Sequence, residues 1–193
     1  MGCVTVSDPS NETVEGQLVT DRTIVWNSDH SSMLYRMGYF GQPVGIRKPK
    51  SPDFDKPLEL SLLESIYLSE ESILVVKSAE DGCVLEKEDL IQIGLEKTPE
   101  FNVRYRVYSE LRSRGYVVRP GLKFGTDFAV YEKGPGIDHA PFMVHVIPQK
   151  KGVDPLDIVR ASRLATSVRK KFIIATVEER GEIGYYSFEW FRP

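Results

Sequence analysis

The sequence predicts an α+β domain at the N-terminus, followed by an α/β domain with a mixed sheet at the C-terminus. The chain has 193 residues, enough for one large domain or two small ones. Patterns of short strands and helices alternate irregularly in the first half, whereas the second half runs helix, strands, helix, strands. Thr98-Pro99 separates the two patterns, so we expect domains at 1–97 and 98–193.

In the first half, short apolar runs separated by turn residues predict strands, and helical spacing predicts helices. The segment "NSDHSS", which contains His30, is expected to be loop. Leu58, Leu62 and Ile66 recur at the spacing of one helix face. The expected elements are, in order, a small antiparallel sheet in 14–50, a linker at 50–57, a helix at 58–70, a strand at 72–78 and a helix at 86–96.

In the second half, the residues that signal helix starts and stops are clearer. Gly115 is a typical stop signal, whereas Asp154 and Pro155 are typical of a helix start. The expected elements are a helix at 101–115, strands in "YVVRPG", "DFAVY" and "PFMVHVIP", a helix at 154–172, and strands in "FIIATV" and "IGYYSFEWF". On the long helix, Arg163 and Lys170 would share one face.

Composition and charge narrow the class of protein. The net charge is −3, divided into −8 over 1–99 and +5 over 100–193, which indicates either a polyanionic partner of the second half or ordinary solvated surface. No apolar run reaches the ~18 residues of a membrane span, and the start of the chain lacks the pattern of a secretory signal. Cys3 and Cys83 are unpatterned, as in reduced cytosolic proteins. We therefore expect a cytoplasmic protein with no membrane contact.

Two residues near one predicted strand edge are candidates for chemistry. Tyr131 ends a strand, and His139 follows a Gly-Pro-Gly turn just before the next strand. If the turn folds back, the phenol and the imidazole can meet over the edge of the sheet. From the residues alone, Tyr131 could equally be a packing residue, His139 an exposed loop residue, and the basic helix face simply solvated.

Three segments of the second half resemble one family closely. "RSRGYVVRPGLKFGTDFAVYEKG", "IDHAPFMVHVIP" and "RLATSVRKKFIIATV" are similar to the archaeal tRNA-splicing endonuclease and to the catalytic subunits of its eukaryotic counterpart. In the first half, the likeness lies chiefly in "LSLLESIYL". The resemblance implies an active site made of Tyr131, His139 and Lys170, with no cofactor and no metal. The Ser-Val-Arg-Lys register selects Lys170 rather than Lys171.

The implied reaction uses the nucleophile of the RNA itself, the 2′-OH beside the scissile phosphate. Tyr131 would act as base, although an ordinary phenol has a pKa of about 10 and needs a nearby cation, which Lys170 could supply. A histidine titrates near neutral pH, so His139 could protonate the leaving 5′-oxygen. Lys170 would stabilise the charged phosphorane. The expected products carry a 2′,3′-cyclic phosphate and a 5′-OH.

The resemblance also implies how RNA and partner subunits bind. The substrate would be precursor tRNA with two small bulges, and arginines commonly hold flipped-out bases. Arg163 and Arg192 correspond to these positions. An acidic turn in "VEERGEIG", with Glu178, Glu179 and Glu182, would dock into a basic cleft of an opposing subunit. The implied particle is a dimer or tetramer, alone or with a second, different endonuclease subunit, and the face of Tyr186, Phe188 and Trp190 would form an apolar dimer surface.

Two alternatives remain open at this point. The strand order also resembles restriction endonucleases, so we expect a restriction-endonuclease-like C-terminal domain, and a metal-dependent nuclease is the first alternative. Asp127 could then bind metal, but "VHV" at 144–146 offers no carboxylate, and His145 is expected to line the sheet. The second alternative is a non-catalytic, RNA-binding structural subunit of the same complex. Such a subunit would be expected to lack part of the Tyr131, His139 and Lys170 set.

Overall fold

The structure, a computed structural model, describes residues 13–121, 125–148, 152, 154–167, 169–178 and 180–188. The chain divides into two compact units. The first unit contains the residues up to Arg36 together with Phe40–Leu90, and the second contains Met37–Tyr39 together with the residues from Ile91 onward. A short segment from early in the sequence therefore belongs to the second unit. The domain limits 1–97 and 98–193 stay a prediction, whereas the structural division falls between Leu90 and Ile91.

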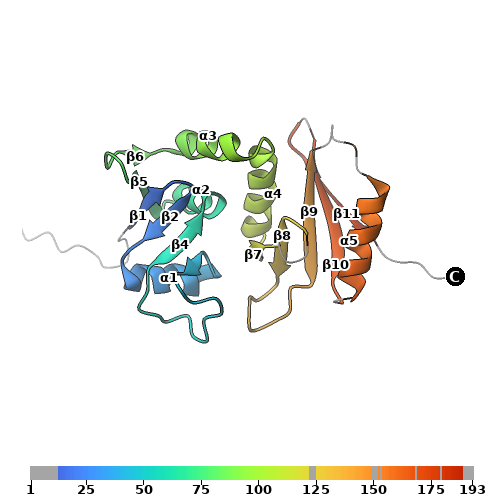
Figure 1. The fold of residues 1–193 in the computed structure, drawn as a ribbon, viewed down its shortest axis with the longest axis horizontal. Coiled ribbons are helices and arrows are strands. Elements are labelled where there is room, and N and C mark those ends of the chain that lie inside the picture. Colours follow the sequence, from blue (N-terminus) through green and yellow to red (C-terminus); the bar gives the residue numbers. More distant parts are fainter. Residues whose placement is uncertain are drawn as a thin grey trace, which may run out of the picture. The chain divides into compact units, whose positions relative to one another are not determined.

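Six strands of the described chain form a mixed sheet in the first unit (Figure 1). They are β1 (Val14–Val19), β2 (Arg22–Val25), β3 (Gln42–Pro43), β4 (Leu58–Ser61), β5 (Leu74–Ser78) and β6 (Val84–Leu85), in the order β3-β4-β2-β1-β5-β6. The strand expected at 72–78 is confirmed as β5. The antiparallel pairing expected within 14–50 is confirmed for β1 and β2, and β1 also pairs in parallel with β5, which lies outside that range.

Helix α1 (Ser28–Gly38) begins where a loop was expected. The carboxamide oxygen of Asn27 accepts hydrogen bonds from the backbone N–H groups of Asp29 and His30, at 2.9 and 3.0 Å. Asn27 therefore satisfies the free donors of the first helical turn, as an N-cap residue does. The loop expected for His30 is wrong, because Asn27 caps a helix that contains this residue.

The segment expected as one helix at 58–70 is a strand followed by a helix, α2 (Leu62–Glu70). Ser61 and Glu64 form a capping box, in which the Glu64 carboxylate accepts from the backbone N–H of Ser61 at 2.9 Å. The same carboxylate accepts from the backbone N–H of Gly41 at 2.8 Å. The cap fixes the helix start four residues later than apolar spacing alone predicted.

In the second unit, five strands of the described chain form the mixed sheet that the sequence predicts. The elements after β6 are α3 (Lys87–Lys97), which crosses the division between the units, α4 (Phe101–Ser113), β7 (Val117–Pro120), β8 (Phe128–Tyr131), β9 (Phe142–Pro148), α5 (Pro155–Ser167), β10 (Lys171–Val177) and β11 (Ile183–Phe188). The strand order is β11-β10-β9-β8-β7, with β9 and β10 parallel and the other neighbours antiparallel.

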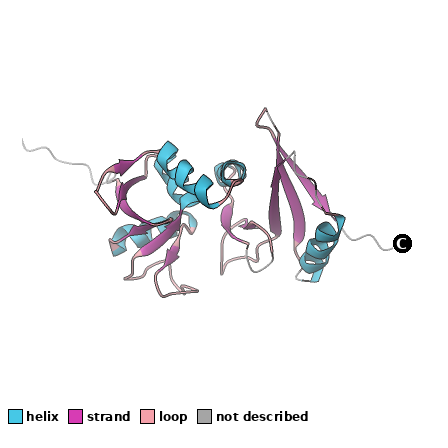
Figure 2. Cartoon of the chain, turned by 45° about the horizontal axis from the view of Figure 1, so that its top comes forward, coloured by secondary structure: helices cyan, strands magenta, loops and turns pink. Residues whose placement is uncertain are grey.

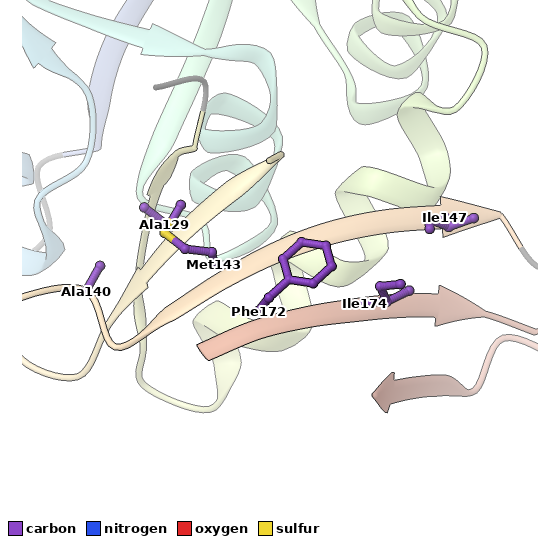
Figure 3. Packing of buried hydrophobic residues seen from close by; sticks show 6 residues of the cluster. All are labelled: Ala129, Ala140, Met143, Ile147, Phe172 and Ile174. Carbon is purple, nitrogen blue, oxygen red and sulfur yellow. The ribbon is translucent and has the colours of Figure 1, made fainter. Parts of the chain in front are cut away.

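Helices α4 and α5 cover opposite faces of this sheet (Figure 2). On the face of α5, a buried cluster contains Ala129, Ala140, Met143, Ile147, Phe172 and Ile174 (Figure 3). Tyr131 of β8 and Ile158 of α5 pack against this cluster. The core therefore extends from the helix to the strand end that carries Tyr131.

Helix α5 is shorter than the sequence predicts. Its apolar and basic pattern suggested a helix to residue 172, but the helix ends at Ser167. Arg169 has φ +55°, a left-handed conformation that cannot continue a helix, and Lys171 already begins β10. The shared helix face expected for Arg163 and Lys170 is therefore wrong, because Lys170 lies in the turn after the helix.

Candidate active site

One edge of the second sheet brings together the ends of three strands. Val130 pairs with Phe142 across β8 and β9, and Phe142 pairs with Lys171 across β9 and β10. The end of β8 thus lies beside the starts of β9 and β10. Tyr131 is the last residue of β8, His139 lies in the loop three residues before β9, and Lys170 directly precedes β10, so the chain brings residues separated by up to 39 positions to one edge of the sheet.

The backbone beside His139 holds Lys170. The ammonium of Lys170 donates a hydrogen bond to the carbonyl oxygen of Ala140 at 2.5 Å. The backbone N–H of Lys171 donates to the carbonyl oxygen of Pro141 at 2.8 Å. Ala140 is buried in the core cluster, while His139 is exposed. The ammonium is therefore held at the backbone of the residue that follows His139, and the His139 side chain is exposed to solvent.

The loop between Tyr131 and His139 is organised by Asp138. Its carboxylate accepts from the backbone N–H groups of Glu132, Lys133 and Gly134 at 3.0, 3.1 and 2.8 Å. Loss of solvent alone would raise the pKa of Asp138, but these bonds outweigh it and hold that pKa below its ordinary value. The residue before His139 thus carries a firmly ionised group that folds the loop back on itself.

The charges around Tyr131 include two that the sequence did not suggest. Burial of the half-exposed phenol raises its pKa, the Arg119 guanidinium lowers it, and the Asp138 carboxylate raises it, with a net increase. Arg119 on β7 is therefore one cation that favours the phenolate, and the same role for Lys170 stays a prediction. Desolvation lowers the pKa of Lys170, and the charge of Asp138 opposes that effect. Sequence reasoning missed both Arg119 and Asp138.

The other residues singled out from the sequence lie at two places. Arg163 is an exposed residue of α5, about one turn before the helix end that leads to Lys170. Glu178 and Glu182 are exposed at the turn between β10 and β11, which is closed by a hydrogen bond from the backbone N–H of Glu178 to the carbonyl oxygen of Glu182 at 2.9 Å. Arg192, Glu179 and Trp190 lie outside the described residues.

The apolar face expected on the final strand is divided in the structure. Tyr186 is 54% exposed. Phe188 instead packs against the chain's own core, with its ring centre 6.3 Å from that of Phe172. Of Tyr186 and Phe188, only Tyr186 therefore presents a large apolar surface to solvent.

At the turn before this strand, the Arg106 guanidinium of α4 lies so close to Gly181 that a side chain there would collide with it.

Asp127, the candidate metal ligand, is engaged by basic groups. The Arg104 guanidinium lies 2.7 Å from one carboxylate oxygen, and His145 Nδ1 lies 2.8 Å from the other. The backbone N–H of Val146 donates to that second oxygen at 2.8 Å. Burial alone would raise the pKa of Asp127, but the His145 bond and the other partners lower it overall. A divalent ion would have to displace these partners, so the described residues give the metal-dependent alternative no support. His145, expected only to line the sheet, is one of those partners.

The structure adds one observation about membranes. Among the helices of the described ranges, none is long and apolar enough to cross a bilayer.

Comparisons with known proteins give a consistent result. A family model for the tRNA intron endonuclease catalytic C-terminal domain matches residues 101–185, and a model for the N-terminal domain of the same endonucleases matches residues 14–91. The chain is 47% identical over 173 residues to a tRNA-splicing endonuclease of Hyperthermus butylicus, covering 89% of this chain and 95% of that protein. It is 41% identical over 179 residues to one of Sulfurisphaera tokodaii, covering 92% and 98%. A protein of the same name from Sulfolobus acidocaldarius is 39% identical over 181 residues, covering 93% and 99%.

Proposed function

The chain belongs to the tRNA intron endonuclease family, and we propose that this RNA endonuclease cuts precursor tRNA at bulge–helix–bulge splice sites without a metal ion. One observation carries the proposal. The strand ends of β8, β9 and β10 bring a phenol, an imidazole and an ammonium to one edge of the sheet. These three groups can complete an RNA cleavage that starts from the 2′-OH of the substrate.

In the proposed mechanism, each group moves or holds a charge. Tyr131, as phenolate, accepts the proton of the 2′-OH, whose oxygen then attacks the adjacent phosphorus. His139 is exposed at the strand edge and protonates the leaving 5′-oxygen. The ammonium of Lys170, held by the Ala140 carbonyl, stabilises the additional negative charge of the phosphorane. The products carry a 2′,3′-cyclic phosphate and a 5′-OH.

The substrate contacts and the assembly are parts of the same proposal. Arg163, close to the helix end before Lys170, and Arg192 hold the bases of the bulges. The particle is a dimer or tetramer of this chain, alone or with a second, different endonuclease subunit, and the exposed Glu178 and Glu182 support docking through the acidic turn. A restriction-endonuclease-like second unit and a cytoplasmic location complete the proposal. The mixed sheet between α4 and α5 supports the former.

A non-catalytic structural subunit is the second candidate function. Its basic residues would bind RNA phosphates while another chain supplies the chemistry. The presence of Tyr131, His139 and Lys170 at one edge favours the catalytic candidate. Cleavage by this chain, alone or together with a second subunit, that is lost in Tyr131→Phe would exclude the non-catalytic candidate.

The experiment that tests the proposed function is an end-group analysis. The purified protein is incubated with a transcribed precursor tRNA that contains a bulge–helix–bulge site, in excess EDTA. We expect cleavage at both bulges, with 2′,3′-cyclic phosphate and 5′-OH ends identified by mass spectrometry. Products with 5′-phosphate ends, or cleavage that appears only after Mg²⁺ is added, would contradict the proposal and favour metal-dependent hydrolysis.

A further inference from the structure

A short segment from the N-terminal half of the sequence, Met37–Tyr39, belongs to the second unit and is hydrogen-bonded to two of its arginines. Arg112 donates from Nη1 to the carbonyl oxygen of Gly38 at 2.7 Å, and Arg119 donates from Nη1 to the carbonyl oxygen of Tyr39 at 2.6 Å. Arg112 is buried and also donates to the Tyr108 hydroxyl at 3.0 Å. Two arginines of the second unit thus hold successive carbonyl groups of this segment.

Tyr39 is held in an unusual conformation and touches the loop that precedes His139. Its φ is +55°, in the left-handed region that residues other than glycine rarely adopt. Its ring lies against Gly134, and a Cβ atom on Gly134 would collide with the ring. Gly134 itself has φ +132°, so only glycine allows both this backbone conformation and the close approach. Tyr39 therefore contacts the catalytic loop with its ring and Arg119 with its carbonyl group.

The register of the hairpin β7–β8 places Arg119 beside Tyr131. Val117 pairs with Tyr131, and Arg119 pairs with Ala129. Residues paired directly across antiparallel strands share a face, as do alternate residues along one strand. Arg119 and Tyr131 are therefore diagonal neighbours on the face of the core cluster, within reach of long side chains.

A phenol that acts as a base needs a nearby cation to stabilise its phenolate, and Arg119 can supply that cation for Tyr131. Burial raises the pKa of Tyr131, which reduces the fraction of phenolate available near neutral pH. Asp138 acts in the same direction, while Arg119 acts in the opposite one. A base in this position needs a cation that does not move away, and the Tyr39 carbonyl restrains the guanidinium.

We propose that Arg119 is a positioning residue for Tyr131: restrained by the Tyr39 carbonyl, its guanidinium stabilises the phenolate that accepts the proton of the RNA 2′-OH. The inference rests on the proposed function, in which Tyr131 is the base. It also assigns a role to Met37–Tyr39, which joins the catalytic unit although it precedes most of the first unit in the sequence.

A titration that does not depend on cleavage tests the first step. Protein labelled with ¹³C at the tyrosine Cζ is titrated by NMR, and the Tyr131 signal is assigned by its loss in Tyr131→Phe. In Arg119→Met we expect the pKa of Tyr131 to rise, and in Arg119→Lys to return toward the wild-type value. Arg22→Met removes a strand arginine of the first unit that pairs with Glu59, and should leave the titration unchanged. An unchanged Tyr131 titration in Arg119→Met would overturn the inference.

A rate measurement tests the second step. The single-turnover rate of RNA cleavage should rise with pH as the base ionises, and in Arg119→Met this rise should move to higher pH. A shifted NMR titration with an unshifted pH–rate profile also overturns the inference. If the proposed function itself is wrong, Tyr131→Phe should cleave RNA at the full wild-type rate, which distinguishes that failure from failure of the Arg119 inference.

If Arg119→Met does not fold, as judged by circular dichroism, Arg119→Lys carries the test. It should keep the Tyr131 pKa below that of an Arg119→Gln variant, and equal values in those two variants would refute the inference.

Discussion

Lys170 donates its ammonium hydrogen bond to the carbonyl oxygen of Ala140, the residue that directly follows His139. This bond ties the turn after α5 to the loop before β9. Ala140 is also part of the buried cluster against which Tyr131 packs. Ala140 thus binds the Lys170 ammonium, follows His139 in the chain and belongs to the cluster that Tyr131 packs against, and the predictions below test what each of the three candidate catalytic groups contributes.

Replacing His139 by Ala should lower the single-turnover rate of cleavage of a bulged precursor tRNA by about 10²–10⁴, the effect of losing one general acid. RNA affinity, measured by filter binding, should change little, because the imidazole supplies a proton more than it supplies phosphate contact. The control is His30→Ala on α1, which should cleave at the wild-type rate. Wild-type activity in His139→Ala at saturating enzyme would remove His139 from the mechanism.

Two adjacent lysines allow a matched comparison. Lys170 is held at the strand edge by Ala140, whereas Lys171 is exposed as the first residue of β10. Lys170→Met should reduce the single-turnover rate by about 10²–10³, the loss expected for one positioned group that stabilises a transition-state charge. Lys171→Met removes the same charge and should affect mainly RNA affinity. Equal losses of rate in the two variants would mean that the positive charge acts only through general attraction of RNA.

Asp127 should stabilise the protein in a pH-dependent manner. Its pKa is lowered in the folded protein, so its contribution is present above the unfolded pKa near 3.9 and is lost as the pH falls through the folded value. Asp127→Asn should lower the free energy of unfolding at pH 7 by about 1.5–3 kcal/mol, the range for hydrogen bonds to charged groups. Urea unfolding from pH 7 to pH 3 should show the difference from wild type shrinking below about pH 4. The exposed Asp55→Asn serves as control, and a difference independent of pH would refute this assignment.

The acidic turn should affect assembly. Glu178→Ala/Glu179→Ala/Glu182→Ala is expected to give a smaller native mass by sedimentation and a lower cleavage rate, because removing one side of an interfacial charge pair costs about 2–5 kcal/mol. Removing three exposed acidic charges elsewhere, in Glu86→Ala/Glu88→Ala/Glu96→Ala, should leave the mass unchanged. A wild-type mass for the first variant would leave the turn as ordinary surface.

Much of the fold could be predicted because it depends on local patterns. The strand β9 follows from a short apolar run, and α4 from helical spacing that stops before Gly115. The predictions were wrong where a cap residue or a single backbone conformation sets the start or the end of a helix. The Ser61–Glu64 capping box was present in the sequence and would have separated β4 from α2. The left-handed Arg169, which ends the run toward Lys170, has no comparable local signal.

The candidate site was predictable only in part, because two of its supports depend on long-range pairing. Tyr131, His139 and Lys170 were selected by resemblance, and their roles stay a prediction. Arg119 becomes a neighbour of Tyr131 only through the β7–β8 register, which the sequence does not state. Tyr39 reaches Gly134 across 95 positions of the chain. Asp138 could have been suspected, since aspartate commonly accepts backbone N–H bonds in turns.

The central claim is that the side chains of Tyr131, His139 and Lys170 act together as one catalytic triad. The most direct test compares single-turnover rate constants, in excess EDTA and at saturating enzyme, for Tyr131→Phe, His139→Ala, Lys170→Met and the triple variant. Groups that act as a unit are strongly non-additive, so the triple variant should cleave about as slowly as the slowest single variant. If instead the rate constant of the triple variant falls by the product of the three single-variant factors, the claim is contradicted and the three residues have independent roles.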